Sequence, residues 1–193
     1  MTHRFFFAIK ISEPLSSAIA AVISPLKNQS AYSQIRWSPP ENWHVTLRFL
    51  GQVEDEKIDT CIEHAKLALQ AIPAFEIKLG LLTVFSIAHP HALVIQVPLS
   101  SALHTAHHAL EKAMIAIGFK SEPHIFSPHI TLGKFQQPCH LTSDFLADLK
   151  KIAMPAYKNQ LVKEIALFQS ETKAEGSVYR LIHQIPLNPH KYS

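Results

Sequence analysis

The 193-residue sequence predicts an α+β fold with two pseudo-symmetric lobes of antiparallel sheet, outer helices and a central cleft. Three observations lead to this prediction. Amphipathic helical segments alternate along the chain with short strand-like runs. The pattern His-x-Thr-Leu occurs twice, once in each half of the chain, within apolar stretches typical of strands. The order of elements around the two copies is similar, so we expect the two motif strands to line the cleft.

The first half of the chain begins with an apolar run over 3–11 that predicts a strand. Helical spacing of apolar residues then predicts a helix that Pro25 ends or kinks. A short strand over 35–38 and the first motif strand over 43–50 follow. An acidic start, which suits the positive end of a helix dipole, opens an amphipathic helix over 54–71.

The second half repeats the alternation of strands and helices. Segments 75–85 and 92–97 predict a pair of strands, and 99–117 predicts an amphipathic helix that ends at Gly118. The remaining predicted elements are the second motif strand over 128–135, a helix over 142–152, and closing strands over 164–170 and 178–185.

Length and composition indicate one compact domain over 1–193 in the cytoplasm. No apolar stretch is long enough to cross a membrane, and the N-terminal run is too short for a signal peptide. Cys61 and Cys139 lack metal-type spacing, and a buried free thiol at Cys61 fits a reducing compartment. The net charge of +3 is compatible with an anionic substrate but predicts no extended nucleic-acid patch.

The two motifs indicate phosphate chemistry. Side chains two positions apart in a strand share a face, so His44 pairs with Thr46 and His129 pairs with Thr131. Two such pairs around one phosphate would supply a general acid, a general base and two hydroxyl donors to the phosphate oxygens. The alternative reading is two half-buried strands that each carry a polar pair without a ligand.

The residues resemble the 2H phosphoesterase superfamily, and most of all the bacterial and archaeal RNA 2′,3′-cyclic phosphodiesterases, also called 2′-5′ RNA ligases. The resemblance spans nearly the whole chain. The segments that carry it are Arg4–Ile9, Arg36-Trp37, Glu41–Gly51, Phe126–Leu132 and Ile165–Ser170, with Gly176 and Tyr179. The chain departs from the family at His124 and Ile125, where Arg-Pro is common, and at Lys134, where Arg is common. These departures concern substrate preference rather than reaction class.

The resemblance implies hydrolysis of an RNA 2′,3′-cyclic phosphate end, or of a nucleoside 2′,3′-cyclic phosphate, to a 2′-phosphate. It implies His44 as proton donor and His129 as proton acceptor, with the roles exchanged in a reverse 2′-5′ ligation. Two imidazoles suffice for this scheme, so we expect no metal and no cofactor. We expect a monomer.

Three further residues are candidates for substrate binding. Arg48 shares the face of His44 by simple alternation, although a solvated rim position is an equal alternative. Lys134 lies an odd number of residues after His129, so it reaches the same face only through a bulge or twist. Trp37 precedes a Pro-Pro turn and is a candidate for stacking a base. Three other aromatic residues are weighed as stacking residues but favoured as core: Phe5, Phe7 and Phe126.

The other histidines are predicted to be structural or surface residues. His104, His107 and His108 have helical spacing that permits metal binding, but no Glu follows as in a zincin helix, so we predict no metal site. His89 and His91 flank a proline in a predicted hairpin and are read as surface residues.

Two other functions stay open from the sequence. One is hydrolysis of 2′-5′ oligoadenylates or another small cyclic phosphodiester, which would use the same four motif residues. The other is a nucleotide-binding or RNA-binding module without turnover, against which the intact His and Thr pairs argue.

Overall fold

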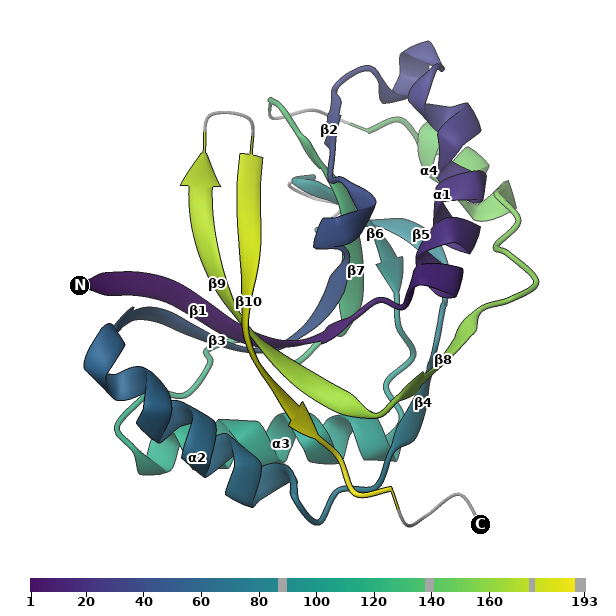
Figure 1. The fold of residues 1–193 in the computed structure, drawn as a ribbon. Helices are drawn as coiled ribbons and strands as arrows, with labels where there is room; N and C mark the ends of the chain where they lie inside the picture. The colour runs from purple at the N-terminus through teal and green to yellow at the C-terminus, as the bar shows by residue number, and fades with distance from the viewer. Residues whose placement is uncertain (87–89, 138–140, 174–175, 190–193) are drawn as a thin grey trace.

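The structure is a computed structural model that describes residues 1–86, 90–137, 141–173 and 176–189 (Figure 1). Its strands are β1 (Thr2–Lys10), β2 (Ile35–Trp37), β3 (His44–Glu54), β4 (Phe75–Lys78), β5 (Leu82–Phe85), β6 (Ala92–Gln96), β7 (His129–Phe135), β8 (Asn159–Val162), β9 (Glu164–Lys173) and β10 (Gly176–Pro186). Its helices are α1 (Glu13–Lys27), α2 (Ile58–Leu69), α3 (Ser101–Ala116) and α4 (Ser143–Lys151), with 3₁₀ turns η1 (Ser30–Tyr32), η2 (Pro40–Asn42) and η3 (Asp55–Lys57). The predicted α+β class is confirmed.

The main sheet is antiparallel and is joined at its centre by the two motif strands. Its order is β10-β9-β1-β3-β7-β6-β5, and β2 also pairs with β7. The only backbone partners between β3 and β7 in the described residues are Val45 and Ile130. This pair divides the sheet into a first lobe (β10, β9, β1 and β3) and a second lobe (β7, β6, β5 and β2), which diverge in Figure 1.

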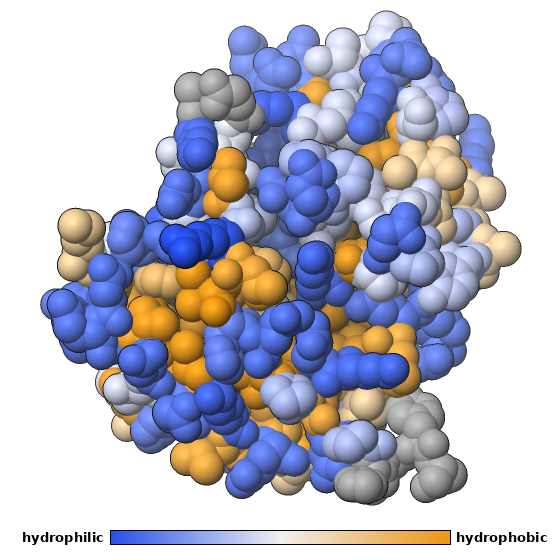
Figure 2. Space-filling view, viewed as in Figure 1, coloured by the Kyte–Doolittle hydropathy of each residue, from blue (hydrophilic) through white to orange (hydrophobic). Residues whose placement is uncertain are grey.

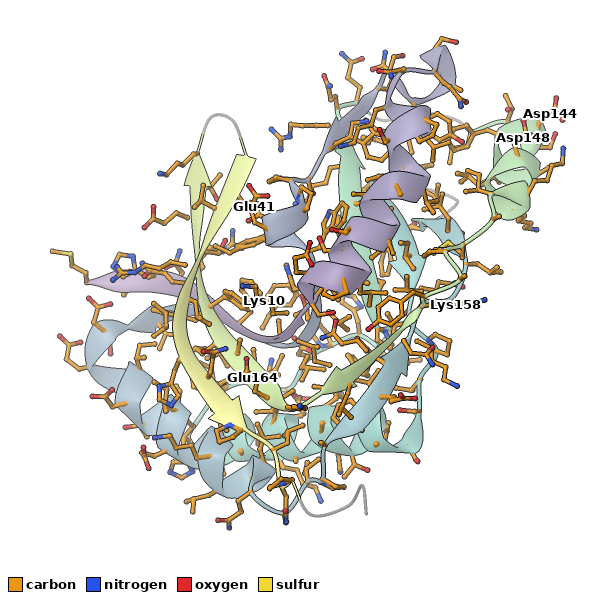
Figure 3. All side chains as sticks on the ribbon, turned by 45° about the vertical axis from the view of Figure 1, so that its right-hand side comes forward. Lys10, Glu41, Asp144, Asp148, Lys158 and Glu164 are labelled. Carbon is orange, nitrogen blue, oxygen red and sulfur yellow. The ribbon has the colours of Figure 1, made fainter. Side chains whose placement is uncertain are left out.

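The helices that cover each lobe come from both halves of the chain. α2 contacts β10 and α3 contacts β3, so both cover the first lobe. α1 and α4 lie beside the second lobe (Figure 1), and α4, which carries Asp144 and Asp148 in Figure 3, contacts β5. Each lobe therefore takes a helix from each half of the chain, which the order of elements alone does not predict.

The two faces of the first lobe have different roles. Phe5, Phe7 and Ile9 alternate along β1 toward the helices and belong to the main core. Phe6 and Ala8 point to the opposite face, where they form a small apolar cluster with Ala166 and Phe168 of β9, against which Tyr179 packs. This second face is the one that carries the motif side chains.

The segment predicted as one strand over 75–85 is two strands in different sheets. β4 pairs with β8 in a separate two-stranded sheet, whereas β5 pairs with β6. The break lies at Gly80, whose amide donates to the carbonyl of Gln96 at 2.7 Å. A Cβ at this position would lie 2.9 Å from that carbonyl oxygen, so the close backbone approach requires glycine. The sequence analysis did not predict β8.

Two helix boundaries also differ from prediction. The helix expected from residue 54 begins at Ile58, because β3 extends to Glu54 and η3 intervenes. Pro25 lies inside the last turn of α1, which continues to Lys27. None of the helices in the described residues is long and apolar enough to span a membrane.

Candidate functional site

Both motifs begin their strands and place the His and Thr on the face opposite the main core. In β3 and β7 alike, the His and Thr are half-buried while the residues between and after them are buried. Val45, Leu47 and Ile130 point into the main core. The predicted alternation of the motif side chains is therefore confirmed up to the Leu of each motif.

The antiparallel pairing of β3 with β7 brings the two motifs together. Val45 is opposite Ile130. Continuing this register puts His44 across from Thr131 and Thr46 across from His129, as a local two-fold axis through the central pair would. The two imidazoles are close enough that the charge of His129 acts on the pKa of His44. The structure therefore brings the two imidazoles near one another, with both Thr residues on the same strands two positions further along.

Each motif imidazole is held by the backbone two residues before it. His44 Nδ1 lies 2.7 Å from the carbonyl oxygen of Asn42, and His129 Nδ1 lies 2.8 Å from that of Ser127. A carbonyl only accepts, so Nδ1 carries the proton and donates in both rings. Within the described part of the chain, neither Nε2 atom has a hydrogen-bond partner. Both Nε2 atoms are thus available to accept or donate a proton.

Aromatic rings fix the orientation of His44. Phe6 lies 4.8 Å from it between ring centroids, and Tyr179 meets it edge-on at 5.1 Å. Asn42 also donates from its side-chain amide to the carbonyl of Ser177 on β10 at 2.8 Å. This bond ties η2 to the β9–β10 hairpin, beside which Glu41 of the same turn lies in Figure 3.

Burial depresses the basicity of both histidines. Desolvation is the main cause that lowers the pKa of His44 from 6.5 to about 4. The hydrogen bond to Asn42 opposes this shift, and the charge of His129 reinforces it. Desolvation also lowers the pKa of His129, opposed by the bond to Ser127, while nearby His91 lowers it further. Phe85 contributes to this burial, with its ring 4.6 Å from that of His129. Without a bound anion, His44 is neutral near pH 7.

Acidification is expected to destabilise the fold through His44. The unfolded chain, with an ordinary pKa of 6.5, binds a proton that folded His44 rejects until about pH 4. The free energy of unfolding therefore falls by up to about 3 kcal/mol as the pH decreases through this window. Thermal melts between pH 4 and 7 should show a shallower slope for His44→Gln than for the native protein. An unchanged slope in that variant, with exposed His108→Gln as control, would contradict the assignment.

Arg48 is not on the phosphate side of β3, so its predicted position is wrong. The register passes from Thr46 opposite Ala8 to Arg48 opposite Phe7, which leaves Leu47 as the extra residue of a β-bulge. The bulge turns Arg48 to the helix side, where it is 3% exposed. There it pairs with Glu111 of α3 and donates to the carbonyls of Phe49 at 2.6 Å and Lys120 at 2.5 Å.

The same bulge occurs in β7 and brings Lys134 to the site side. Thr131 is opposite Val94 and Gly133 is opposite Leu93, so Leu132 is the extra residue. Lys134 in the second motif thus corresponds to Phe49 in the first. Both residues line a cavity of about 290 Å³ with His44, Phe6, Tyr179 and Arg4, which we call the His44 cavity. The bulge considered for Lys134 from the sequence is present.

Among the aromatic candidates, Phe5 borders the His44 cavity from the core side, and the others lie elsewhere. Trp37 does not line the His44 cavity; its ring lies 6.4 Å from Tyr32, with the Lys27 ammonium 5.7 Å above it. Phe5 and Phe7 are buried in the main core, as favoured from the sequence. Phe126 stacks in parallel on His107 at 3.9 Å. Arg4, Phe49 and Tyr179 entered the sequence analysis only as members of the segments that carry the resemblance, without a predicted role at the site.

The histidine cluster on α3 has a structural member. His107 Nδ1 lies 2.8 Å from the carbonyl of Leu47, so this ring binds the bulge of β3. His104 and His108 are exposed and stack on each other at 6.0 Å. In the described ranges, no group of three or more His, Cys, Asp or Glu side chains is placed to hold a metal ion. His89 and Cys139 lie outside the described residues, whereas Cys61 is a buried free thiol.

Comparisons with known proteins agree with this geometry. Residues 9–95 match the family model described as LigT like Phosphoesterase. The RNA 2′,3′-cyclic phosphodiesterase of Methanothermobacter thermautotrophicus is 25% identical over 182 residues, covering 93% of this chain and 96% of the relative. The protein of the same name from Methanocaldococcus jannaschii is 26% identical over 189 residues, covering 94% and 99%.

Solved structures share the fold at lower identity. Escherichia coli LigT complexed with 3′-AMP superposes with a TM-score of 0.76 at 22% identity, covering 97% of this chain and 99% of that one. TT0787 of Thermus thermophilus has a TM-score of 0.74 at 21% identity, with the same coverage. The chain is thus similar to LigT-like phosphoesterases, since the family model matches residues 9–95 and the two RNA 2′,3′-cyclic phosphodiesterases align with 93% and 94% of the chain.

Proposed function

We propose that this protein hydrolyses 2′,3′-cyclic phosphate ends of RNA to 2′-phosphates by two-histidine acid–base catalysis. The carrying observation is that two His–Thr pairs face one another at the Val45–Ile130 pair, with both Nε2 atoms unpartnered in the described structure. The name RNA 2′,3′-cyclic phosphodiesterase, shared by relatives that match most of the chain, supports the choice of substrate.

In the proposed reaction, water attacks phosphorus and the P–O3′ bond breaks. His129 Nε2 takes the proton from the water, and His44 Nε2 gives a proton to the departing O3′. The hydroxyls of Thr46 and Thr131 donate to the non-bridging oxygens and hold phosphorus between the two rings. If the 5′-hydroxyl of a second RNA replaced water as the nucleophile, the same two proton transfers would join the RNA ends through a 2′-5′ bond, with His129 and His44 keeping their roles rather than exchanging them as the resemblance led us to expect.

The depressed pKa of His44 has a consequence for this scheme. At a pKa of about 4, His44 is neutral near pH 7 in the free protein and has no proton to donate. The negative charge of a bound phosphate raises the pKa of a neighbouring imidazole. Binding of the substrate would therefore promote the protonation of His44, the proposed general acid.

The rate is expected to depend on pH as a bell with an acidic maximum. Because kcat/KM reports the free enzyme, its maximum should lie between about pH 4 and 6.5, in the range of the two depressed pKa values. The maximum of kcat should lie at higher pH, since bound phosphate raises both pKa values. Initial rates from pH 4 to 8 test this, and a flat kcat/KM profile would refute the two-imidazole scheme.

The direct test uses an RNA oligomer that ends in a 2′,3′-cyclic phosphate, incubated with protein in EDTA and followed by ³¹P NMR. We expect a 2′-phosphate to form despite the chelator. A 3′-phosphate product would overturn the proposed bond cleavage. Nucleotide binding without any product would favour the binding-module alternative, and turnover of 2′-5′ oligoadenylate alone would favour the other phosphodiesterase.

A further inference from the structure

A second cavity continues from the His44 cavity along the first lobe. It has a volume of about 470 Å³ and is lined by His3, Gln52, Glu171 and Lys173, among others; we call it the outer cavity. The two cavities share three lining residues, Arg4, Ser170 and Thr172. The shared wall makes one path that leads away from His44 over β1, β3 and β9.

Strand register explains why these residues share the path. Arg4 of β1 is opposite Ser170 of β9 on one side and Gln52 of β3 on the other. Arg4 points to the same face as Phe6, two residues along β1, and Phe6 packs against His44. Arg4 thus lies one side-chain row beyond the row that contacts the reacting centre.

Arg4 is available to bind an anion. Its side chain is exposed, and in the ranges the structure describes no carboxylate lies within ion-pair distance of it. Arg48, the arginine predicted to approach the phosphate, is by contrast buried against Glu111 and Glu122. Lys134 and Lys173 add positive charge at the two ends of the path, whereas Glu171 is its acidic member.

The His44 cavity also has an exposed aromatic side chain on which a base could stack. Phe49 is 57% exposed although it sits in a strand, and its ring lies 5.7 Å from that of Phe6. Exposed aromatic faces beside a cationic groove are typical of sites that bind single-stranded nucleic acid. Arg4 lines the same cavity as Phe49, so a terminal nucleoside lying against Phe49 would have Arg4 beside it.

We infer that Arg4 binds the phosphate on the 5′ side of the terminal nucleotide and that the outer cavity receives the preceding nucleotides. The site then selects RNA chain ends over single cyclic nucleotides. Because the guanidinium forms charge-assisted hydrogen bonds with phosphate oxygens, the contact is expected to raise kcat/KM by about tenfold or more. This inference rests on the proposed function and specifies its substrate class.

The test compares adenosine 2′,3′-cyclic phosphate with the same molecule bearing a 5′-phosphate, and with a trinucleotide that has the same end. The native protein should prefer the two phosphate-bearing substrates about tenfold or more in kcat/KM. Arg4→Gln should abolish the preference and reduce the slope of log(kcat/KM) against log salt by about 0.7 on those substrates. Arg180→Gln, at an exposed position of β10 outside both cavities, should keep the preference.

Each outcome decides between the two proposals. Turnover of all three substrates without a preference, or an equal loss on all three in Arg4→Gln, would overturn the role of Arg4 and leave the proposed function standing. No turnover of any substrate would overturn the proposed function, and with it this inference.

Discussion

Replacing His129 by alanine is expected to lower kcat by about 10²–10⁴-fold, and replacing His44 should do the same. Each change removes one of the two proton transfers, while the Thr hydroxyls and the cavity wall still bind the phosphate. KM should therefore change much less than kcat. The double variant should be little slower than either single one, because the two rings act as a unit.

Rates on an RNA oligomer ending in a cyclic phosphate, measured beside thermal melts, test this prediction. His108→Ala is the matched control, since His108 is exposed on α3 and contacts only His104 among the ring contacts described. It should keep full activity. If His44→Ala or His129→Ala lost its cooperative melt, that histidine would be structural, and a variant that melted normally and retained turnover would eliminate it as acid or base.

Arg48→Met is expected to cause the largest loss of stability of any single change at the site. It leaves the Glu111 and Glu122 carboxylates, 13% and 24% exposed, without the cation that compensates them. Breaking a buried pair on one side costs about 3–5 kcal/mol. For a chain of this size that corresponds to a decrease in Tm of roughly 6–20 °C.

A thermal melt of Arg48→Met, compared with Lys57→Met, measures this effect. Lys57 pairs with Glu54 at 2.9 Å on the surface, where solvent screens the two charges, so its loss should leave the melt nearly unchanged. Adding Glu111→Leu to Arg48→Met should restore part of the stability by removing the orphaned charge. A stable Arg48→Met with a raised KM would instead return Arg48 to substrate binding.

The placement of the motif side chains was predictable from the sequence because it depends on a local rule. Two residues two positions apart in a strand share a face, and that rule holds for both His–Thr pairs. The rule fails one residue later, since the bulges at Leu47 and Leu132 shift the residues that directly follow them to the other face. Alternation therefore misplaced Arg48, and only the basic residue at Lys134 hinted at a bulge.

Which helices cover which lobe could not be predicted from the sequence, for a different reason. Amphipathic faces identify which helices are buried, but not which sheet surface buries them. α1 lies beside the second lobe (Figure 1) although β3, its neighbouring motif strand, belongs to the first. α3 covers the first lobe although β7 belongs to the second. Both placements depend on contacts between distant segments. The pairing of β4 with β8 is similar: its partners lie far apart along the chain, and β8 has only four residues.

The pairing of Val45 with Ile130 is the narrowest connection between the two lobes of the sheet. If one lobe rotates against the other about this pair, every atom moves in proportion to its distance from it. The motif histidines are next in sequence to this pair and would keep their spacing, whereas Lys134, on the second lobe, would move further relative to the rest of the His44 cavity, which the first lobe lines. Such a motion would widen the His44 cavity at Lys134 for a polymeric substrate without changing the distance between the two motif histidines.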